Sequence, residues 1–207
     1  MTGQDDRPPS TRRERWDRRH AGEAPIESPE PDPTLIETVR GLQPGLALDL
    51  GSGDGRNAVW LASQGWQVTA VDFSSVALDR GRARAAERGV EVEWVLADLL
   101  EWEPPRARFD LVSLIFIHLP PDERRRVYDR AAAAVAPGGT LLIVAHDRTN
   151  LTEGAGGPQD PDVLFTPDEV AAELRGFSLL RTETRQRPAA EGRGPIDAVV
   201  IAVRRNL

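Results

Sequence analysis

Hydrophobic positions along the chain form short apolar runs that alternate with amphipathic segments of helical period. The runs predict strands at 46–50, 67–71, 91–96, 109–116 and 140–145. The segments between them predict helices at 35–41, 56–64, 75–88 and 121–135, with a further short helix at 166–174. Such alternation is typical of a parallel sheet with helices on both faces, because each parallel crossover needs a connecting helix.

Two more segments, at 177–185 and 196–204, are predicted as strands and are joined by a polar segment that contains glycine and proline. They predict an antiparallel hairpin at the end of the chain. The fold prediction is therefore an α/β, Rossmann-like, doubly wound sheet of seven strands. Most strands are parallel, the last two form the hairpin, and helices cover both faces.

The first 33 residues lack this alternation and are rich in proline, arginine and acidic residues. We expect residues 1–33 to form an N-terminal arm, disordered over 1–10 and with one or two helical turns around Trp16, and residues 34–207 to form the domain. The segment 146–167 has no clear secondary structure. Its place after the fifth strand favours a substrate lid over a floppy insertion.

Composition narrows the function. The chain has 207 residues, of which 40% are apolar and 29% charged, and this fits a single globular domain. The net charge of −7 argues against a general nucleic-acid binder, so we interpret the charged run 123–126 as a solvated helix face. The absence of cysteine excludes disulfides, zinc–thiolate sites and cysteine nucleophiles. Without an apolar leader or a membrane-length apolar run, we expect a cytoplasmic monomer or homodimer.

The segment DLGSGDG (residues 49–55) follows the first predicted strand and carries the main chemical signal. Its glycines let the backbone turn sharply and approach a ligand closely. The helix that follows offers free N–H groups and the positive end of its dipole. The spacing Gly-x-Gly-x-Gly differs from the Gly-x-Gly-x-x-Gly of dinucleotide enzymes, since Arg56 stands where the third glycine would be. This difference argues against an NAD(P)-dependent oxidoreductase.

Acidic residues stand at the ends of three successive predicted strands. Asp72 ends the second strand, 23 residues after Asp49, where its carboxylate can accept both hydroxyls of a ribose. Asp98 follows the third strand, in a position to reach an adenine ring. Because ligands of doubly wound sheets bind at this edge, the pattern favours a ligand that contains adenosine.

These segments resemble class I S-adenosylmethionine (SAM)-dependent methyltransferases, and the resemblance covers nearly the whole chain. It rests on ALDLGSGDGRN (47–57), VTAVDFS (68–74), ADLLEW (97–102), FDLVSLIFIHLP (109–120) and VAPGG (135–139). GRN at 55–57 and the Trp16-Asp17 pair resemble the tellurite-resistance and thiopurine-methyltransferase-like group of small-molecule enzymes. That group often has a tyrosine where this chain has His20. The resemblance implies SAM as the cofactor and a small-molecule acceptor: a thiol, an oxyanion or a hydroxyl.

The resemblance also implies which residues bind the cofactor. Residues after the first strand would surround the amino-acid end of SAM, Asp72 would hold the ribose, and residues near the second and third strand ends would flank the adenine. Residues 115–118 would line the methyl-transfer pocket. The full expected set is Asp49, Gly51, Ser52, Gly53, Asp72, Phe73, Asp98, Leu99, Ile115 and Trp16.

Three residues are candidates for a general base: His118, His146 and Asp147. Both histidines follow strands at the ligand-binding edge, and each has an alternative as a hydrogen-bonded structural residue. Asp147 is better suited to a loop or N-cap role. Trp16 could cover the sulfonium of SAM with its ring face or could only dock the arm on the domain. A non-catalytic SAM-binding or interaction module on the same fold is the alternative to an enzyme.

Overall fold

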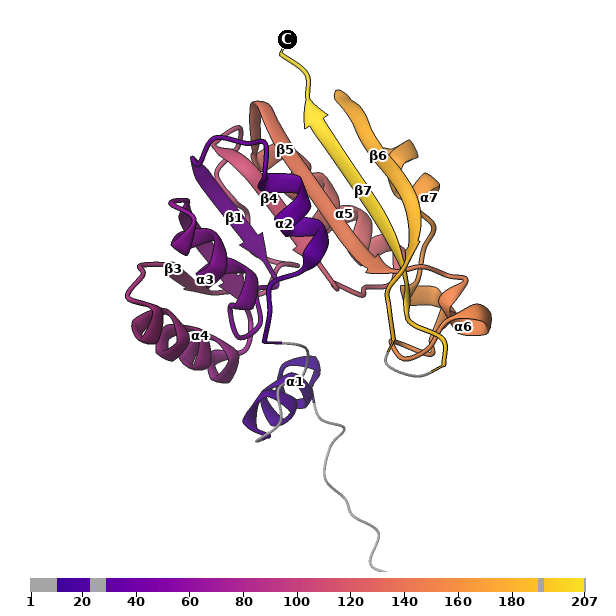
Figure 1. Ribbon diagram of the computed structural model, residues 1–207, viewed down its shortest axis with the longest axis horizontal. Helices are drawn as coiled ribbons and strands as arrows, with labels where there is room; N and C mark the ends of the chain where they lie inside the picture. Colours follow the sequence, from indigo (N-terminus) through magenta and orange to yellow (C-terminus); the bar gives the residue numbers. More distant parts are fainter. Residues whose placement is uncertain (1–10, 23–28, 190–191, 207) are drawn as a thin grey trace, which may run out of the picture.

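The computed structural model describes residues 11–22, 29–189 and 192–206, and its centre is one seven-stranded sheet (Figure 1). The strand order is β3-β2-β1-β4-β5-β7-β6. The strands are β1 (Leu46–Leu50), β2 (Gln67–Asp72), β3 (Glu93–Leu96), β4 (Phe109–Ile115), β5 (Val135–His146), β6 (Phe177–Gln186) and β7 (Ile196–Arg204). Strands β1 to β5 are parallel, and β7 lies antiparallel between β5 and β6. The predicted fold class is confirmed.

Helices cover both faces of the sheet. They are α1 (Arg12–Ala21), α2 (Pro33–Val39), α3 (Arg56–Ser63), α4 (Ser75–Arg88), α5 (Pro121–Ala134), α6 (Asn150–Glu153) and α7 (Pro167–Glu173), with a 3₁₀ turn η1 (Pro161–Val163). Local sequence sets their ends. The hydroxyl of Ser74 accepts a hydrogen bond from the N–H of Ala77 and so caps α4, which ends at Gly89 in the left-handed conformation. Thr166 and Glu169 form a reciprocal capping box on α7.

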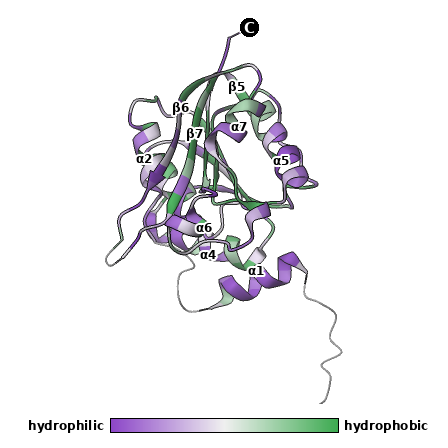
Figure 2. Cartoon of the chain, turned by 90° about the vertical axis from the view of Figure 1, so that its right-hand side faces the viewer, coloured by the Kyte–Doolittle hydropathy of each residue, from purple (hydrophilic) through white to green (hydrophobic). Residues whose placement is uncertain are grey.

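The sheet separates two buried layers of apolar side chains. Leu35 of α2 and Leu61 of α3 belong to one layer, while Tyr128 of α5, Phe165 and Val170 of α7 belong to the other. The hydropathy colouring shows hydrophobic strands β5 and β7 and a mainly hydrophilic α1 (Figure 2). Covering on both faces explains why the central strands are apolar along their whole length.

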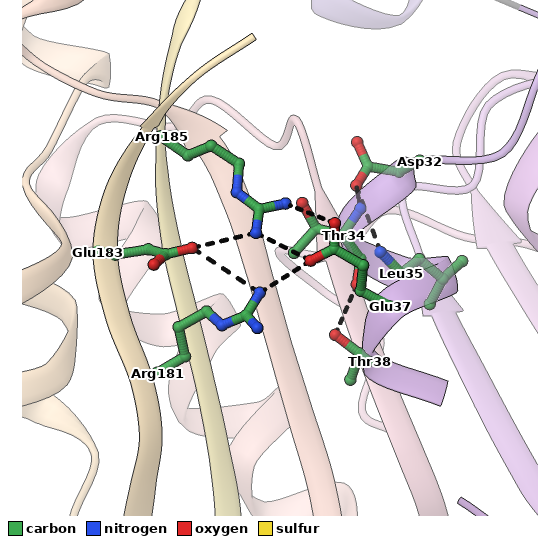
Figure 3. A network of polar contacts seen from close by, with 8 residues as sticks. All are labelled: Asp32, Thr34, Leu35, Glu37, Thr38, Arg181, Glu183 and Arg185. Carbon is green, nitrogen blue, oxygen red and sulfur yellow. Dashed lines mark hydrogen bonds and ion pairs between the residues drawn. The ribbon is translucent and has the colours of Figure 1, made fainter. Parts of the chain in front are cut away.

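An ion-pair network joins α2 to the edge strand β6 (Figure 3). Glu37 of α2 accepts hydrogen bonds from Arg181 at 3.0 Å and from Arg185 at 2.8 and 3.1 Å. Glu183 pairs with the same two arginines. The arginine hydrogen bonds lower the pKa of Glu37 to about 2. The network therefore adds partly exposed charge contacts between α2 and β6, while Leu35 anchors α2 in the buried apolar layer.

The structure corrects several boundary and loop predictions. Helix α1 has ten residues, more than the one or two turns expected. Strand β5 begins at Val135 and not at 140, because Val135 already pairs with Phe109 of β4; the register then shifts, and pairing resumes where Thr140 lies opposite Leu111. The segment 146–167 contains α6 and η1, so it is not without secondary structure.

The charged run 123–126 is also not wholly a solvated face. Arg124 is only 7% exposed and lies over the ring of Phe165 at 4.9 Å from the ring centre, since a guanidinium stacks well on an aromatic face. Residues 1–10, expected to be disordered, lie outside the described residues. Within the described ranges, none of the helices has the length and apolar character needed to cross a bilayer.

Candidate cofactor and acceptor site

The loop after β1 folds tightly over the end of β2. Gly51, Gly53 and Gly55 have φ angles of 69°, 54° and 76°, in the left-handed region that favours glycine. The N–H groups of Gly51 and Ser52 donate to the carbonyl of Val71 at 2.8 and 3.0 Å. The loop therefore lies at the point where β1 has β2 on one side and β4 on the other, which is the ligand-binding position of a doubly wound sheet.

Gly55 has a packing role in addition to its conformation. A Cβ atom on Gly55 would lie 2.4 Å from Cη2 of Trp94, and a Cβ on Gly81 of α4 would meet the same ring atom at 2.4 Å. Two glycines thus make room for the indole, which packs between the loop and α4. Trp94 is therefore a packing residue.

Asp49 lies beneath the loop and is 1% exposed. Its Oδ1 accepts a hydrogen bond of 2.9 Å from the hydroxyl of Ser113, its neighbour on β4. Its Oδ2 is buried and makes no hydrogen bond within the described residues. Burial raises the pKa of Asp49 to about 7. The free oxygen is therefore an acceptor that a cationic or hydrogen-bonding ligand group can satisfy.

Asp72 fixes the loop from the end of β2. Its Oδ2 accepts from the N–H of Gly53 at 2.9 Å and its Oδ1 from the N–H of Ser74 at 2.8 Å. Burial raises the pKa of Asp72, while these backbone hydrogen bonds and nearby His20 oppose the rise. Each carboxylate oxygen keeps a further lone pair, so the group can hold the loop and still accept hydrogen bonds from a ligand.

A single cavity brings most of the predicted site residues together. Nine of the ten predicted cofactor residues line it together with His118, and the exposed Asp98 is one of them, with its carboxylate accepting the N–H of Leu100. The predicted residues on its wall are Gly51, Ser52, Gly53, Asp72, Phe73, Asp98, Leu99, Ile115, His118 and Trp16. Asp49 and His146 lie behind the wall. Within the described residues, no three histidine or carboxylate side chains are grouped as in a metal site.

Sequence reasoning missed two arm residues, Arg12 and His20, which also line the cavity. Together with Trp16 they recur every fourth residue, and this spacing places them on one face of α1. The spacing can be seen in the sequence, but only the docked position of α1 shows that this face of the helix is directed to the cavity. Trp16 lies 5.0 Å from the guanidinium carbon of Arg19, so an arginine already occupies one face of the ring.

The two histidines are in contact with each other at the ends of β4 and β5. Nε2 of His118 accepts a hydrogen bond from the backbone N–H of His146 at 3.3 Å and lies 3.2 Å from its Nδ1. The carbonyl of Phe116 also accepts a hydrogen bond from His118. Burial lowers the pKa of each histidine to about 4, with further lowering of His146 by Arg187. Both imidazoles are therefore neutral at pH 7.

Phe116, within the range 115–118 that was expected to line the pocket, stands in the left-handed region with φ of 61°, which is rare for a bulky residue. Its ring lies beside His146, at 5.1 Å between ring centres, and within 4.9 Å of the guanidinium carbon of Arg187. The strained backbone turns this ring into the cavity wall between the cofactor loop and the histidine pair.

Comparison with known proteins agrees with this geometry. Residues 47–139 match a methyltransferase domain family. Ribosomal RNA small subunit methyltransferase C of Alcanivorax borkumensis is 31% identical over 148 residues, 67% of this chain and 42% of that protein. An uncharacterised methyltransferase of Mycobacterium tuberculosis is 36% identical over 121 residues, 58% of this chain and 60% of that protein. The chain thus spans about half the length of these curated relatives.

Solved structures share the fold and, in one case, the cofactor. The 1,6-didemethyltoxoflavin-N1-methyltransferase of Burkholderia thailandensis, with S-adenosylhomocysteine (SAH) bound, has a TM-score of 0.64 and 26% identity over 84% of this chain and 77% of that one. Residues 47–139 thus match a methyltransferase domain, and the fold around them is the Rossmann-like fold of SAM-dependent methyltransferases. A structure from echinomycin biosynthesis, where a disulfide becomes a thioacetal, shares the fold, with a TM-score of 0.74 and 23% identity over 93% and 92% of the two chains.

The methyltransferase domain offers side chains that fit each part of SAM, its cofactor. The remaining lone pairs of Asp72 can accept hydrogen bonds from ribose hydroxyls, and the unsatisfied Oδ2 of Asp49 lies behind the cavity wall, under the glycine loop. Leu99 offers apolar contact for the adenine. Gly53 brings its backbone to the cavity with only the edge of His20 above it. The individual roles remain predictions.

Proposed function

We propose that this chain is an enzyme that transfers the methyl group of SAM to a small-molecule acceptor. The observation that carries the proposal is the continuity of one cavity from Asp72 and Asp98 to Ile115 and His118. Such a cavity would hold the cofactor and an acceptor side by side. Its cover by α1 favours a small acceptor over a nucleic acid, and the name of the toxoflavin methyltransferase also describes a small heteroaromatic acceptor.

The proposed mechanism is alignment in a desolvated site. Bound SAM supplies a methyl group that is already activated on a sulfonium. Asp49 and Asp72 would fix the two ends of the cofactor next to the loop, while Ile115 and Leu119 offer apolar surface that excludes water from the acceptor side. Well-oriented reactants gain effective molarities of roughly 10⁵ M or more. The chain therefore contributes mainly by positioning the reactants and by excluding water from the site.

A proton must also leave when the acceptor is a hydroxyl. We assign this task to the histidine pair, with His146 as the base and His118 as the residue that positions it. Nε2 of His118 accepts from His146, so the proton of neutral His118 belongs on its other nitrogen, and Nδ1 of His146 is held as a donor. This leaves Nε2 of His146 as the basic atom. It has no hydrogen-bond partner within the described residues.

The narrower assignment to the tellurite-resistance and thiopurine-methyltransferase-like group stays part of this proposal. It predicts thiols or metalloid oxyanions as acceptors. The experiment is methyl transfer from labelled SAM to a panel of thiols, phenols, N-heterocycles, metalloid oxyanions and a structured RNA. Turnover of a small molecule supports the proposal. Turnover of RNA alone overturns the acceptor class, and normal SAM binding with no turnover on the whole panel favours the non-catalytic module.

A further inference from the structure

Helix α1 presents one face to the cofactor cavity. Arg12, Trp16 and His20 lie four residues apart on this helix, and all three line the cavity. His20 is 7% exposed, and its Cε1 lies 3.6 Å from the position that a Cβ on Gly53 would occupy. The stripe therefore forms a roof above the glycine loop.

Polar contacts hold the roof at both sides of the cavity. On one side, the hydroxyl of Ser74 donates to Asp17 at 2.5 Å, and Arg80 of α4 donates to the carbonyl of Gly22. On the other side, Arg12 pairs with Glu123 of α5 at 2.7 Å. Figure 1 shows α1 beyond the carboxyl end of β1 and beside α4. The helix thus bridges α4 and α5 across the cavity.

The contacts described above stabilise this roof only weakly. A helix of ten residues is marginal by itself in water, and the only buried side chain of α1 is that of His20. The contacts with α4 and α5 are partly exposed hydrogen bonds and one ion pair, and exposed ion pairs stabilise weakly. A ligand under the stripe would add contacts to Trp16 and His20 that only the docked helix can make.

We propose that α1 is a movable roof of the cofactor site, which docks over the bound cofactor through Arg12, Trp16 and His20 and must lift for the cofactor to exchange. This assigns Arg12 and His20 to the cofactor site and makes the Arg12–Glu123 pair its latch. A cofactor with a higher affinity for the docked form of α1 than for the lifted form shifts the equilibrium toward the docked form. The proposal rests on the cofactor and does not depend on the acceptor.

The test breaks the helix without touching its inner face. Arg18 is exposed and does not line the cavity. Arg18→Pro removes a backbone donor in the helix interior and clashes with the preceding turn, whereas Arg18→Ala removes the same charge and keeps the helix. The full chain and both variants are titrated with SAH by calorimetry, and hydrogen–deuterium exchange of residues 11–22 is followed with and without SAH. We expect SAH to slow this exchange in the full chain and in Arg18→Ala, and Arg18→Pro to bind SAH at least tenfold more weakly.

The latch has its own variant and a matched control. Glu123→Gln breaks the pair with Arg12 and is expected to speed SAH dissociation about two- to fivefold, in line with a partly exposed ion pair. Asp79→Asn, which breaks the exposed Arg82–Asp79 pair on α4, is expected to leave dissociation unchanged. Equal SAH affinity of Arg18→Pro and Arg18→Ala, or exchange in α1 that SAH does not alter, would overturn the roof. Failure of the unsubstituted chain to bind SAH overturns the cofactor assignment as well, whereas absent methyl transfer affects only the proposed function.

Discussion

Substitution of Asp72 separates the structural role of the carboxylate from its proposed contact with the ribose. The carboxylate accepts two backbone N–H groups, from Gly53 and Ser74, in a site that is 7% exposed. Asp72→Ala loses both bonds, and hydrogen bonds to a charged group stabilise by about 1.5–3 kcal/mol each. Asp72→Asn keeps the shape and one oxygen, so it should retain one of the two bonds. We expect Asp72→Ala to lower the free energy of unfolding by about 3 kcal/mol or more and Asp72→Asn by about half as much.

The asparagine variant should also bind the cofactor more weakly. Loss of charge-assisted bonds to the ribose costs about 1–3 kcal/mol, a 5- to 150-fold weaker affinity for SAH. Calorimetric titration with SAH and chemical denaturation measure the two quantities. Thr166→Ala removes the N-cap of α7, far from the cavity, and should cost about 1 kcal/mol of stability with no change in affinity. Wild-type SAH affinity in Asp72→Asn would refute the assignment of Asp72 to the cofactor.

Three further predictions concern the loop and the histidines. Gly55→Ala should lower the free energy of unfolding by about 1–2 kcal/mol because of its left-handed φ, and by a further amount because the new Cβ meets Trp94. Gly89→Ala, at a φ of 63° with open space around it, should show only the conformational cost. Equal losses for the two variants in chemical denaturation would exclude the packing role of Gly55. The lowered pKa values of His118 and His146 mean that the unfolded chain binds more protons between pH 6.5 and about 4, so these two groups together should remove about 3 kcal/mol of stability between pH 6.5 and 5. Buried carboxylates with raised pKa values change stability in the opposite direction, so the double variant His118→Asn/His146→Asn serves as the reference. If the stability of the unsubstituted chain depends on pH as that of the double variant does, the lowered histidine pKa values are contradicted. His146→Ala should lower turnover of a hydroxyl acceptor at least tenfold with SAH affinity within twofold; normal turnover would make His146 structural.

The fold was predictable because the central strands are apolar runs and most helices end at a recognisable signal. Gly89 is such a signal for α4, and the structure places it in the left-handed conformation. The start of β5 could not be predicted in the same way. Pro137 and two glycines after it are typical of a turn, but here they lie inside the strand, where the pairing with β4 is irregular between Phe109 and Leu111. Turn residues in a bulge have the same local signature as turn residues in a loop.

The site was predictable where chain order determines position, and only there. Residues that directly follow parallel strands reach the same edge of the sheet, so Asp72, Asp98 and His118 were expected near one cavity, and they line it. Arg12 and His20 come from a helix that no neighbouring strand positions. Their part in the cavity depends on contacts with α4 and α5, which are distant in sequence. Local sequence carries no information on such docking.

The arrangement of the histidine pair bears on the acceptor. A thiolate or an oxyanion needs no base, whereas a hydroxyl must pass a proton to a nearby lone pair. His118 lines the cavity but directs its lone pair at His146, and His146 directs its free Nε2 toward Gly157, where even a Cβ would lie 2.7 Å away. A base in this position can serve the acceptor only if the backbone near Gly157 moves. Requirement of His146 for turnover would therefore imply both a protonated acceptor and a moving loop, whereas turnover without it would favour the thiols and oxyanions.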